Sequence, residues 1–352
     1  ITNTYSGTRG GAILNTKGGD LTIINSTFTN TTVRGKNTAG GAIFYQKGSL
    51  FVIDSNFINC TAGQSAGAII STGDLIVLNS TFINDKIVGN STTKRYGGAI
   101  RGSNVTVVDS KFENCQAQDE GSDIYATETI RLLANDYDGK TNYITPAEVS
   151  GSPIINIIPG SFAEVQVRID CTQANGVLNL ENKKYTAIAN DTTINITKNI
   201  VINGQGAILD ADNRFRIMNI ADGVSVTLNN INFINGNVTD GSYGGGAIRT
   251  NNGTVTVTNS TFINTTANLG HGGAIYNYYG GITVTNSTFI NTTANLGSGG
   301  AIYNNHNVMV IGSTFTNTTA GSGSAIFGGD GGITVTNSTF INTTATIGSG
   351  GA

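Results

Sequence analysis

The sequence predicts an all-β chain folded as a parallel β-helix, and three observations support this. A Phe-x-Asn motif recurs nine times, 25 to 30 residues apart within each of two groups. A Gly-Gly-Ala-Ile block, exact or degenerate, precedes eight of these copies, and two aliphatic residues stand seven and five positions before each Phe. Self-similarity with a period of about 20–50 residues is typical of solenoids, in which each repeat forms one coil.

The aliphatic pairs predict a strand in every coil. Pairs such as Leu75/Val77 and Val255/Val257 are two residues apart, and the residue between them is often Thr. A period of two places alternate side chains on opposite faces of a strand, whereas the repeats lack the 3.6-residue stripe of an amphipathic helix. We therefore expect coils of three short strands, with a Phe stack and an aliphatic stack inside.

The Asn of the Phe-x-Asn motif predicts a structural ladder at one corner of the coils. Stacked coils lie about 4.8 Å apart, so equivalent amides can bond the coils above and below, and Asn tolerates the left-handed backbone of a sharp turn. We expect these amides to be buried. The ladder residues are Asn30, Asn59, Asn84, Asn114, Asn235, Asn264, Asn291, Asn317 and Asn342.

The two glycines of each Gly-Gly-Ala-Ile block predict another corner. Either a positive φ or a close approach of neighbouring coils excludes a Cβ there.

Two of the three cysteines, Cys60 and Cys115, occupy the same position in coils that are separated by one intervening coil. Because this separation is about 10 Å, beyond the roughly 7 Å that a disulfide spans, we expect unpaired, buried thiols.

The repeats fall into two modules. Four copies of the motif precede a gap of about 120 residues that contains all three prolines, and five copies follow it. We expect residues 1–130 to form the C-terminal part of a first β-helix, 131–165 a non-repetitive connector, and 166–352 the N-terminal part of a second. An alternative is one continuous β-helix with a lateral insertion in the middle. Both ends of the sequence fall within a coil, which favours a monomeric segment of a longer chain whose signal peptide and anchor lie elsewhere.

Composition argues against two classes of partner. The net charge is −3 and only 12% of the residues are charged, so no electrostatic attraction to nucleic acid is expected. The chain has no apolar run of 18 residues, so we expect no membrane insertion within it. Between residues 217 and 352 the only basic side chain is Arg249.

Candidate chemical groups are sparse, and we expect no catalytic centre, no cofactor, no metal and no enzymatic activity. His271 and His306 fall at different corners of the coil and are predicted to be exposed loop residues. The segment 136–139 resembles half of a calcium loop but lacks the terminal Glu, so calcium is not expected. The densest charge group is predicted to be a solvated capping loop: Asp210, Asp212, Arg214 and Arg216.

The Gly-Gly-Ala-Ile blocks, the Asn-Ser-Thr-Phe-Ile-Asn-Thr-Thr strings at 259–266, 286–293 and 337–344, and the segment 200–235 carry a family resemblance. Over residues 1–130 and 175–352 the chain resembles adhesin-like surface proteins of methanogenic archaea. It is also similar to the repeats of chlamydial polymorphic outer-membrane proteins, although those place two residues between Phe and Asn and this chain places one. Both resemblances imply a right-handed β-helix, which the crossover rule also favours, together with export and a role in adhesion.

These observations predict an extracellular, cell-surface scaffold that attaches to glycans or proteins of another cell. The alternative is a carbohydrate-binding or polysaccharide-degrading β-helix, because tyrosines cluster in the second module. The loops 86–96 and 237–244 vary in length and are candidate contact points. Two further groups are possible ligand contacts, an outward apolar strip and a tyrosine cluster: Phe51, Ile53, Ile76 and Leu78, and Tyr276, Tyr278, Tyr279 and Tyr303.

Overall fold

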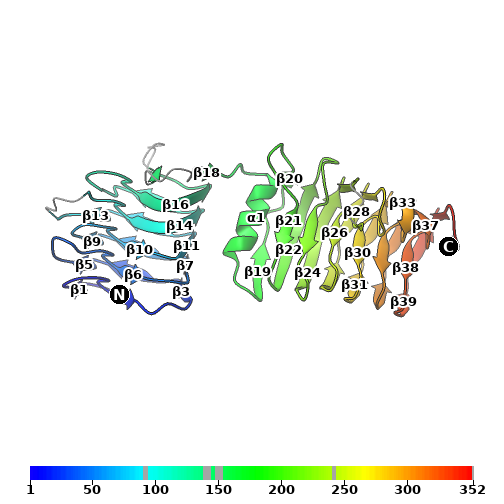
Figure 1. Cartoon of the computed structure of the whole chain (residues 1–352), viewed down its shortest axis with the longest axis horizontal. Helices are drawn as coiled ribbons and strands as arrows, with labels where there is room; N and C mark the ends of the chain where they lie inside the picture. The colour runs from blue at the N-terminus through cyan, green and yellow to red at the C-terminus, as the bar shows by residue number, and fades with distance from the viewer. Residues whose placement is uncertain (90–93, 138–143, 147–153, 240–242, 351–352) are drawn as a thin grey trace. The chain divides into compact units, whose positions relative to one another are not determined.

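The computed structural model describes residues 1–89, 94–137, 144–146, 154–239 and 243–350. The chain divides into two compact units, Ile1–Pro159 and Gly160–Ala352. In each unit the strands of successive coils pair in parallel and stack along the unit (Figure 1). The predicted parallel β-helix is therefore confirmed.

The first unit has three β-walls. The first wall is β1 (Tyr5–Ser6), β5 (Thr32–Val33), β9 (Thr61–Ala62) and β13 (Lys86–Ile87). The second is β4 (Thr27–Thr29), β8 (Asn56–Ile58), β12 (Thr81–Ile83) and β15 (Lys111–Glu113). The third is β2 (Ile13–Asn15), β3 (Leu21–Ile24), β6 (Ile43–Tyr45), β7 (Ser49–Ile53), β10 (Ile69–Ser71), β11 (Asp74–Leu78), β14 (Ile100–Val108), β16 (Ile124–Leu133), β17 (Ile144–Pro146) and β18 (Ile154–Asn156).

The expectation of three strands per coil is wrong. A coil such as the one from β6 to β9 contains four short strands, because the third wall contributes two of them, β6 and β7, and a corner then separates the aliphatic strand β7 from the Phe strand β8. At that corner Asp54 has a φ of 49°, and Asn59 after the Phe has a φ of 55°. Asn and Asp adopt this left-handed conformation more readily than other residues with side chains, so each of the two positions turns the chain.

The described residues of the predicted connector, 131–165, belong to the two units. Tyr137 continues the Phe stack, with its ring centroid 5.5 Å from that of Phe112. The strands β17 and β18 both pair with β16, and Ile154 is in register with Ile130. The first unit thus extends to Pro159, and the remainder of the predicted connector belongs to the second unit.

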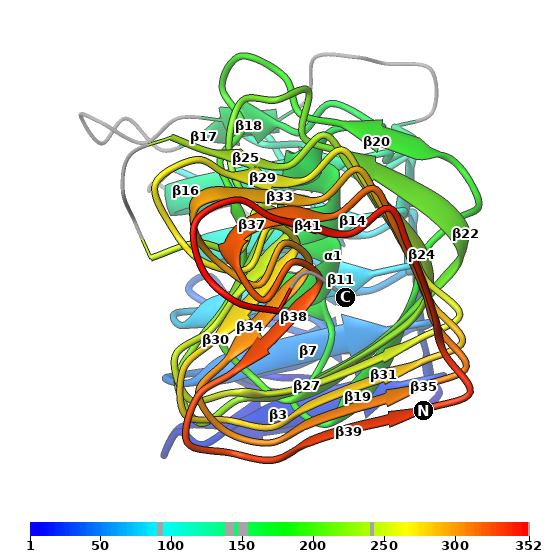
Figure 2. The same ribbon diagram turned by 90° about the vertical axis from the view of Figure 1, so that its right-hand side faces the viewer.

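The second unit also has three walls, and Figure 2 shows its yellow-to-red coils as nested loops. The largest wall is β19 (Gly176–Asn179), β20 (Lys184–Thr186), β22 (Ile200–Asp210), β24 (Ser225–Ile234), β27 (Thr254–Thr258), β28 (Thr261–Ile263), β31 (Ile282–Thr285), β32 (Thr288–Ile290), β35 (Val308–Ile311), β36 (Thr314–Thr316), β39 (Ile333–Thr336) and β40 (Thr339–Ile341). A second wall is β21 (Ile194–Ile196), β23 (Met218–Ile220), β26 (Ile248–Arg249), β30 (Ile275–Asn277), β34 (Ile302–Asn304) and β38 (Ile326–Gly328). The third is β25 (Asn237–Val238), β29 (Thr266–Ala267), β33 (Thr293–Ser298), β37 (Thr319–Ser322) and β41 (Thr344–Ala345).

A helix that the sequence analysis did not predict, α1 (Phe162–Cys171), covers the first coil of the second unit (Figure 1). Its apolar side chains, including Phe162, Val165 and Ile169, join the hydrophobic core. Ser161 caps the helix by accepting from the Glu164 N–H at 3.3 Å, and the Glu164 carboxylate accepts from the Gly160 N–H at 2.6 Å. This is a variant of the capping box, and the Ser-x-x-Glu spacing is the signal that could have revealed it.

The predicted Phe stacks run through both cores. Ring centroids of neighbouring motif Phe residues lie 4.7 to 4.9 Å apart, with interplanar angles of 1 to 9°.

Both expected reasons for glycine are found at the Gly-Gly corners. Gly272 has a φ of 63°, and a Cβ on Gly273 would lie 2.1 Å from the Gly300 carbonyl oxygen. The three cysteines are buried and form no disulfide with one another.

The Asn ladder forms, but its predicted burial is wrong. The Asn59 Nδ2 donates to Asn30 Oδ1 at 3.1 Å, and Asn291 donates to Asn264 at the same distance. Eight of the nine predicted ladder residues are exposed and Asn235 is half-buried, because the left-handed turn points the side chain out of the corner.

A second ladder of serine hydroxyls lies inside the coils. A serine stands two positions before eight of the nine motif Phe residues, and Ile231 stands before Phe233. From Ser55 onward its Oγ accepts from the backbone N–H at the equivalent position of the preceding coil, as Ser287 Oγ does from the Ser260 N–H at 3.1 Å. The same contact joins Ser80 Oγ to the Ser55 N–H. These hydroxyls satisfy buried backbone donors at a corner, which is the role that the sequence analysis gave to Asn.

Candidate functional site

An aromatic column lies on the outer side of the second unit's six-stranded wall. The residue that follows each Gly-Gly-Ala-Ile block is in register with its counterpart in the next coil, giving the series Arg249, Tyr276, Tyr303 and Phe327. The Tyr276 and Tyr303 rings stack at 5.3 Å and 5°, and Tyr303 stacks on Phe327 at 5.3 Å and 2°. The predicted repetition of Tyr276 by Tyr303 is thus an actual contact.

Hydrogen-bonded turns fix the tyrosines beside this column. Asn277 Nδ2 donates to the Gly253 carbonyl at 2.9 Å, and its Oδ1 accepts from the Gly280 N–H at 3.2 Å. The Tyr279 N–H donates to the Asn251 carbonyl at 2.7 Å. Because Asn277 is buried, it holds the turn that carries Tyr278 and Tyr279 against the turn of the preceding coil.

The tyrosines line a groove of about 760 Å³. Tyr276 and Tyr303 form its floor and are 3% and 9% exposed. Tyr243 and Tyr279 flank it and are 64% and 63% exposed, so their rings are accessible to a ligand. The lining residues are Asp222, Tyr243, Asn251, Asn252, His271, Tyr276, Tyr278, Tyr279 and Tyr303.

All four tyrosines that the sequence analysis selected therefore lie in one groove, but the analysis missed the rest of the lining. Tyr243 and His271 belong to the turns that enter the Gly-Gly corners, and Asp222 and Asn251 come from the turns that follow β23 and β26. The sequence signal that could have revealed part of this lining is the position of Tyr243 and His271 directly before the glycines at two Gly-Gly-Ala-Ile blocks.

The prediction that His271 is an exposed loop residue is wrong, because the side chain is half-buried against Tyr303, with ring centroids 4.5 Å apart. Its Nδ1 accepts from the Ser298 N–H at 2.9 Å, which leaves Nε2 as the protonated nitrogen of a neutral ring. Burial lowers the pKa of His271 below its ordinary value, so the ring is neutral at pH 7.

Arg216 positions the turn that carries Tyr243. Its guanidinium is buried and donates to the carbonyls of Gly244 and Gly245, with Nη2–O and Nε–O distances of 2.8 and 2.9 Å. Its Nη1 donates to Asn219 Oδ1 at 3.1 Å. The predicted solvated capping loop is therefore wrong for Arg216, whose buried guanidinium holds one side of the groove. It is also wrong for Asp210, which is buried and pairs with Lys184 at 2.7 Å.

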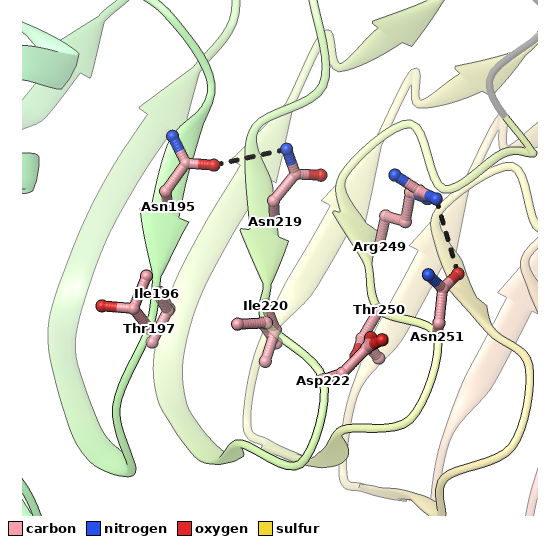
Figure 3. A pocket seen from close by; sticks show the side chains of 10 residues that line it. Asn195, Ile196, Thr197, Asn219, Ile220, Asp222, Arg249, Thr250 and Asn251 are labelled. Carbon is pink, nitrogen blue, oxygen red and sulfur yellow. Dashed lines mark hydrogen bonds between the residues drawn. The ribbon is translucent and has the colours of Figure 1, made fainter.

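A second, polar cavity of about 240 Å³ adjoins the groove and shares Asp222 and Asn251 with it. Figure 3 shows Asn195, Asn219 and Arg249 extending in a row from successive coils. Asn219 Nδ2 donates to Asn195 Oδ1 at 3.4 Å, and Arg249 Nη2 to Asn251 Oδ1 at 3.4 Å. Amide and guanidinium groups can bond hydroxyl and carboxylate groups of a ligand, whereas the tyrosines offer aromatic surfaces.

The outward strip of the first unit lies on the adjacent strands β7 and β11. Phe51 is in register with Ile76, and Ile53 with Leu78, and all four side chains are half-buried. The described strands of the predicted connector, β17 and β18, extend the ladder beyond β16 rather than lying across this strip. The role of the strip as a ligand contact stays a prediction.

Several predicted features fall partly outside the described residues. Of the loops 86–96 and 237–244, residues 90–93 and 240–242 are not described, and neither are Asp138 and Gly139 of the half calcium loop. In the part of the chain that is described, His, Cys, Asp and Glu side chains form no cluster of three that could hold a metal ion. Within the same residues, no helix has the length and apolar character needed to cross a membrane.

Comparisons with known proteins gave no further identification: no protein-family model, no curated protein and no solved structure matched the chain. The parallel β-helix rests on the repeats and the strand pairing of this chain. The resemblance to adhesin-like proteins stays a prediction.

Proposed function

We propose that the chain is an extracellular, adhesin-like scaffold that attaches to other cells by binding surface glycans in the tyrosine-lined groove of its second unit. The groove carries this proposal. It combines accessible aromatic rings with amide groups, a combination that suits a sugar, which offers apolar C–H faces and several hydroxyls. The stacked coils of the fold form a scaffold that presents the groove.

The pre-formed geometry of the groove also supports binding. The turn of Tyr279 is fixed by the buried Asn277, and the turn of Tyr243 is fixed by the buried Arg216. A site that is already ordered loses less conformational entropy when a ligand binds.

A binding role fits better than glycoside cleavage. Glycosidases generally require two carboxylates that flank the scissile bond, and Asp222 is the one carboxylate in the described lining of the groove. We therefore propose a role in attachment and not in degradation.

The test is a glycan-array and cell-binding measurement on the whole chain and on two variants. Tyr279→Ala is expected to weaken glycan binding at least fivefold, because the variant loses an exposed ring at the groove. The matched control is Tyr5→Ala, which removes a tyrosine that is 62% exposed in the first unit and should leave binding unchanged. If the wild-type chain bound no glycan, or if Tyr279→Ala bound as well as wild type, the proposal would be refuted.

A further inference from the structure

We infer that the preferred ligand is an acidic glycan, in which a carboxylate-bearing sugar binds Arg249 in the polar cavity and a neighbouring neutral sugar binds in the tyrosine groove. This inference rests on the proposed glycan-binding function and specifies the ligand class. Two observations support it: the incomplete hydrogen bonding of Arg249, and the residues that the two cavities share.

Arg249 is a half-buried cation without a carboxylate partner among the described residues. Its guanidinium lies 5.6 Å from the centre of the Tyr243 ring, and Nη2 has a long bond of 3.4 Å to Asn251 Oδ1. Its Nε is buried and has no hydrogen-bond partner within the described part of the chain. The surroundings of Arg249 therefore leave a donor unsatisfied.

The other arginines of this unit have carboxylate or backbone carbonyl partners. Arg168 and Arg214 pair with the carboxylates of Glu164 and Asp212 at 2.9 and 3.1 Å, and Arg216 donates to backbone carbonyls. Arg249 is also the only basic residue between 217 and 352. A planar guanidinium matches the two oxygens of a carboxylate, and such charge-assisted bonds are stronger than those to neutral groups. An acidic ligand is the missing partner that this geometry fits.

The position of Arg249 allows one ligand to reach both cavities. Arg249 begins the same outward column that continues with Tyr276 and Tyr303, and its turn contributes Asn251 to both linings. Asn219 and Asn195 continue the row from Arg249 through the preceding coils and can bond hydroxyls (Figure 3).

Asp222 limits the number of negative charges that a ligand can carry at this site. It lines both cavities, and as a carboxylate it can accept from a sugar hydroxyl but repels a second negative charge. The site therefore suits a uronic acid that is adjacent to a neutral sugar, rather than a continuous run of acidic sugars.

The experiment compares two probes that differ only in the carboxyl group. One is a hyaluronan oligosaccharide, in which a uronic acid alternates with a neutral N-acetylhexosamine, and the other is the same oligosaccharide after reduction of its carboxyl groups to alcohols. Titration calorimetry on the whole wild-type chain is expected to give at least tenfold tighter binding of the acidic probe, and added salt should reduce this difference. Equal affinity for the two probes would overturn the inference and leave the proposed function standing.

The variant Arg249→Gln is expected to abolish the preference for the acidic probe while keeping the affinity for the reduced probe. Arg34→Gln is the matched control, because Arg34 lies 5.4 Å from the ring centre of Tyr5 in the first unit and should not affect either affinity. An unchanged preference in Arg249→Gln would overturn the role of this residue. Should this variant fail to fold, the comparison of the two probes on the wild-type chain decides by itself. If neither these probes nor any neutral glycan binds, the proposed function falls together with the inference.

Discussion

The two units use the same repeat position in opposite ways. In the first unit, guanidinium groups lie over the aromatic rings of the outward column: Arg9 is 4.7 Å from the ring centre of Phe44, and Arg101 is 5.6 Å from that of Tyr125. In the second unit, Tyr276 stacks on Tyr303 beside a groove, and the single basic residue of this region, Arg249, stands at the start of the column. The two units thus differ in what lies against this column: guanidinium groups in the first unit and a groove in the second.

The cores beneath these surfaces are alike, and the largest expected effect tests this likeness. Phe57→Ala and Phe262→Ala each remove one fully buried ring from the middle of a stack. We expect each variant to lose about 3–5 kcal/mol of unfolding free energy from its own unit, measured by guanidinium denaturation. A loss below about 1 kcal/mol in one variant and not the other would contradict the equivalence of the two cores.

The units are expected to differ in their response to alkaline pH because of Asp85. This carboxyl is fully buried in the first unit, where its Oδ1 accepts from the Cys60 N–H at 2.7 Å. Burial raises its pKa from 3.8 to about 8, so the neutral form is the one that fits the folded state. The stability that this group contributes is fully present below pH 4 and is lost as the pH rises through 8.

Asp85→Thr is therefore expected to stabilise the first unit at pH 8 and to remove a loss on the order of 3 kcal/mol between pH 5 and pH 8. Thr is the natural choice because Thr31 and Thr265 occupy the equivalent position in other coils. Thermal unfolding across this pH range provides the measurement, with the exposed Asp54→Asn as the control. A wild-type unit that is equally stable at pH 5 and pH 8 would contradict the assignment.

The second unit is expected to show the opposite dependence at its helical cap. Although burial acts to raise it, the pKa of Glu164 is held below its ordinary value by the Gly160 N–H and by ion pairs with Arg168 and Lys183. The stability from this carboxylate is present above its ordinary pKa and is lost as the pH falls through the lowered value.

Glu164→Gln should cost about 2 kcal/mol at pH 7, because two cations lose their shared partner while remaining partly hydrated. The cost should shrink on acidification as the wild-type carboxylate becomes protonated. Denaturant unfolding at pH 7 and pH 3 checks this, with Glu181→Gln as the control because its carboxylate is exposed. A cost that is the same at both values of pH would argue against an ionic role.

The smallest expected effect on stability distinguishes the inner serine ladder from the outer Asn ladder. Ser287→Ala removes the buried acceptor of the Ser260 N–H and should cost about 1–2 kcal/mol. Asn291→Ala removes an exposed amide two residues after the Phe289 of the same coil, and should cost less than about 1 kcal/mol. Equal losses in the two variants would show that the exposed amides stabilise the stack as much as the buried hydroxyls do.

The sequence by itself determined the parallel β-helix, the register of its Phe stacks and the alignment of Tyr276 with Tyr303. These features follow from a fixed repeat length, because equivalent residues of stacked coils must lie one strand spacing apart. The predicted Gly-Gly corners also follow from the residue type, since glycine adopts a positive φ at little steric cost and has no Cβ to block the close approach of the next coil.

Only the tertiary structure decided which of these residues are covered. Whether an Asn amide lies inside or outside depends on the direction of its turn, and Arg216 is buried only because the turn of Gly244 and Gly245 lies over it. The groove likewise brings Asp222, Tyr243 and Tyr279 together from three coils. Burial and convergence depend on contacts between coils whose loops differ in length, and a repeat pattern does not specify those contacts.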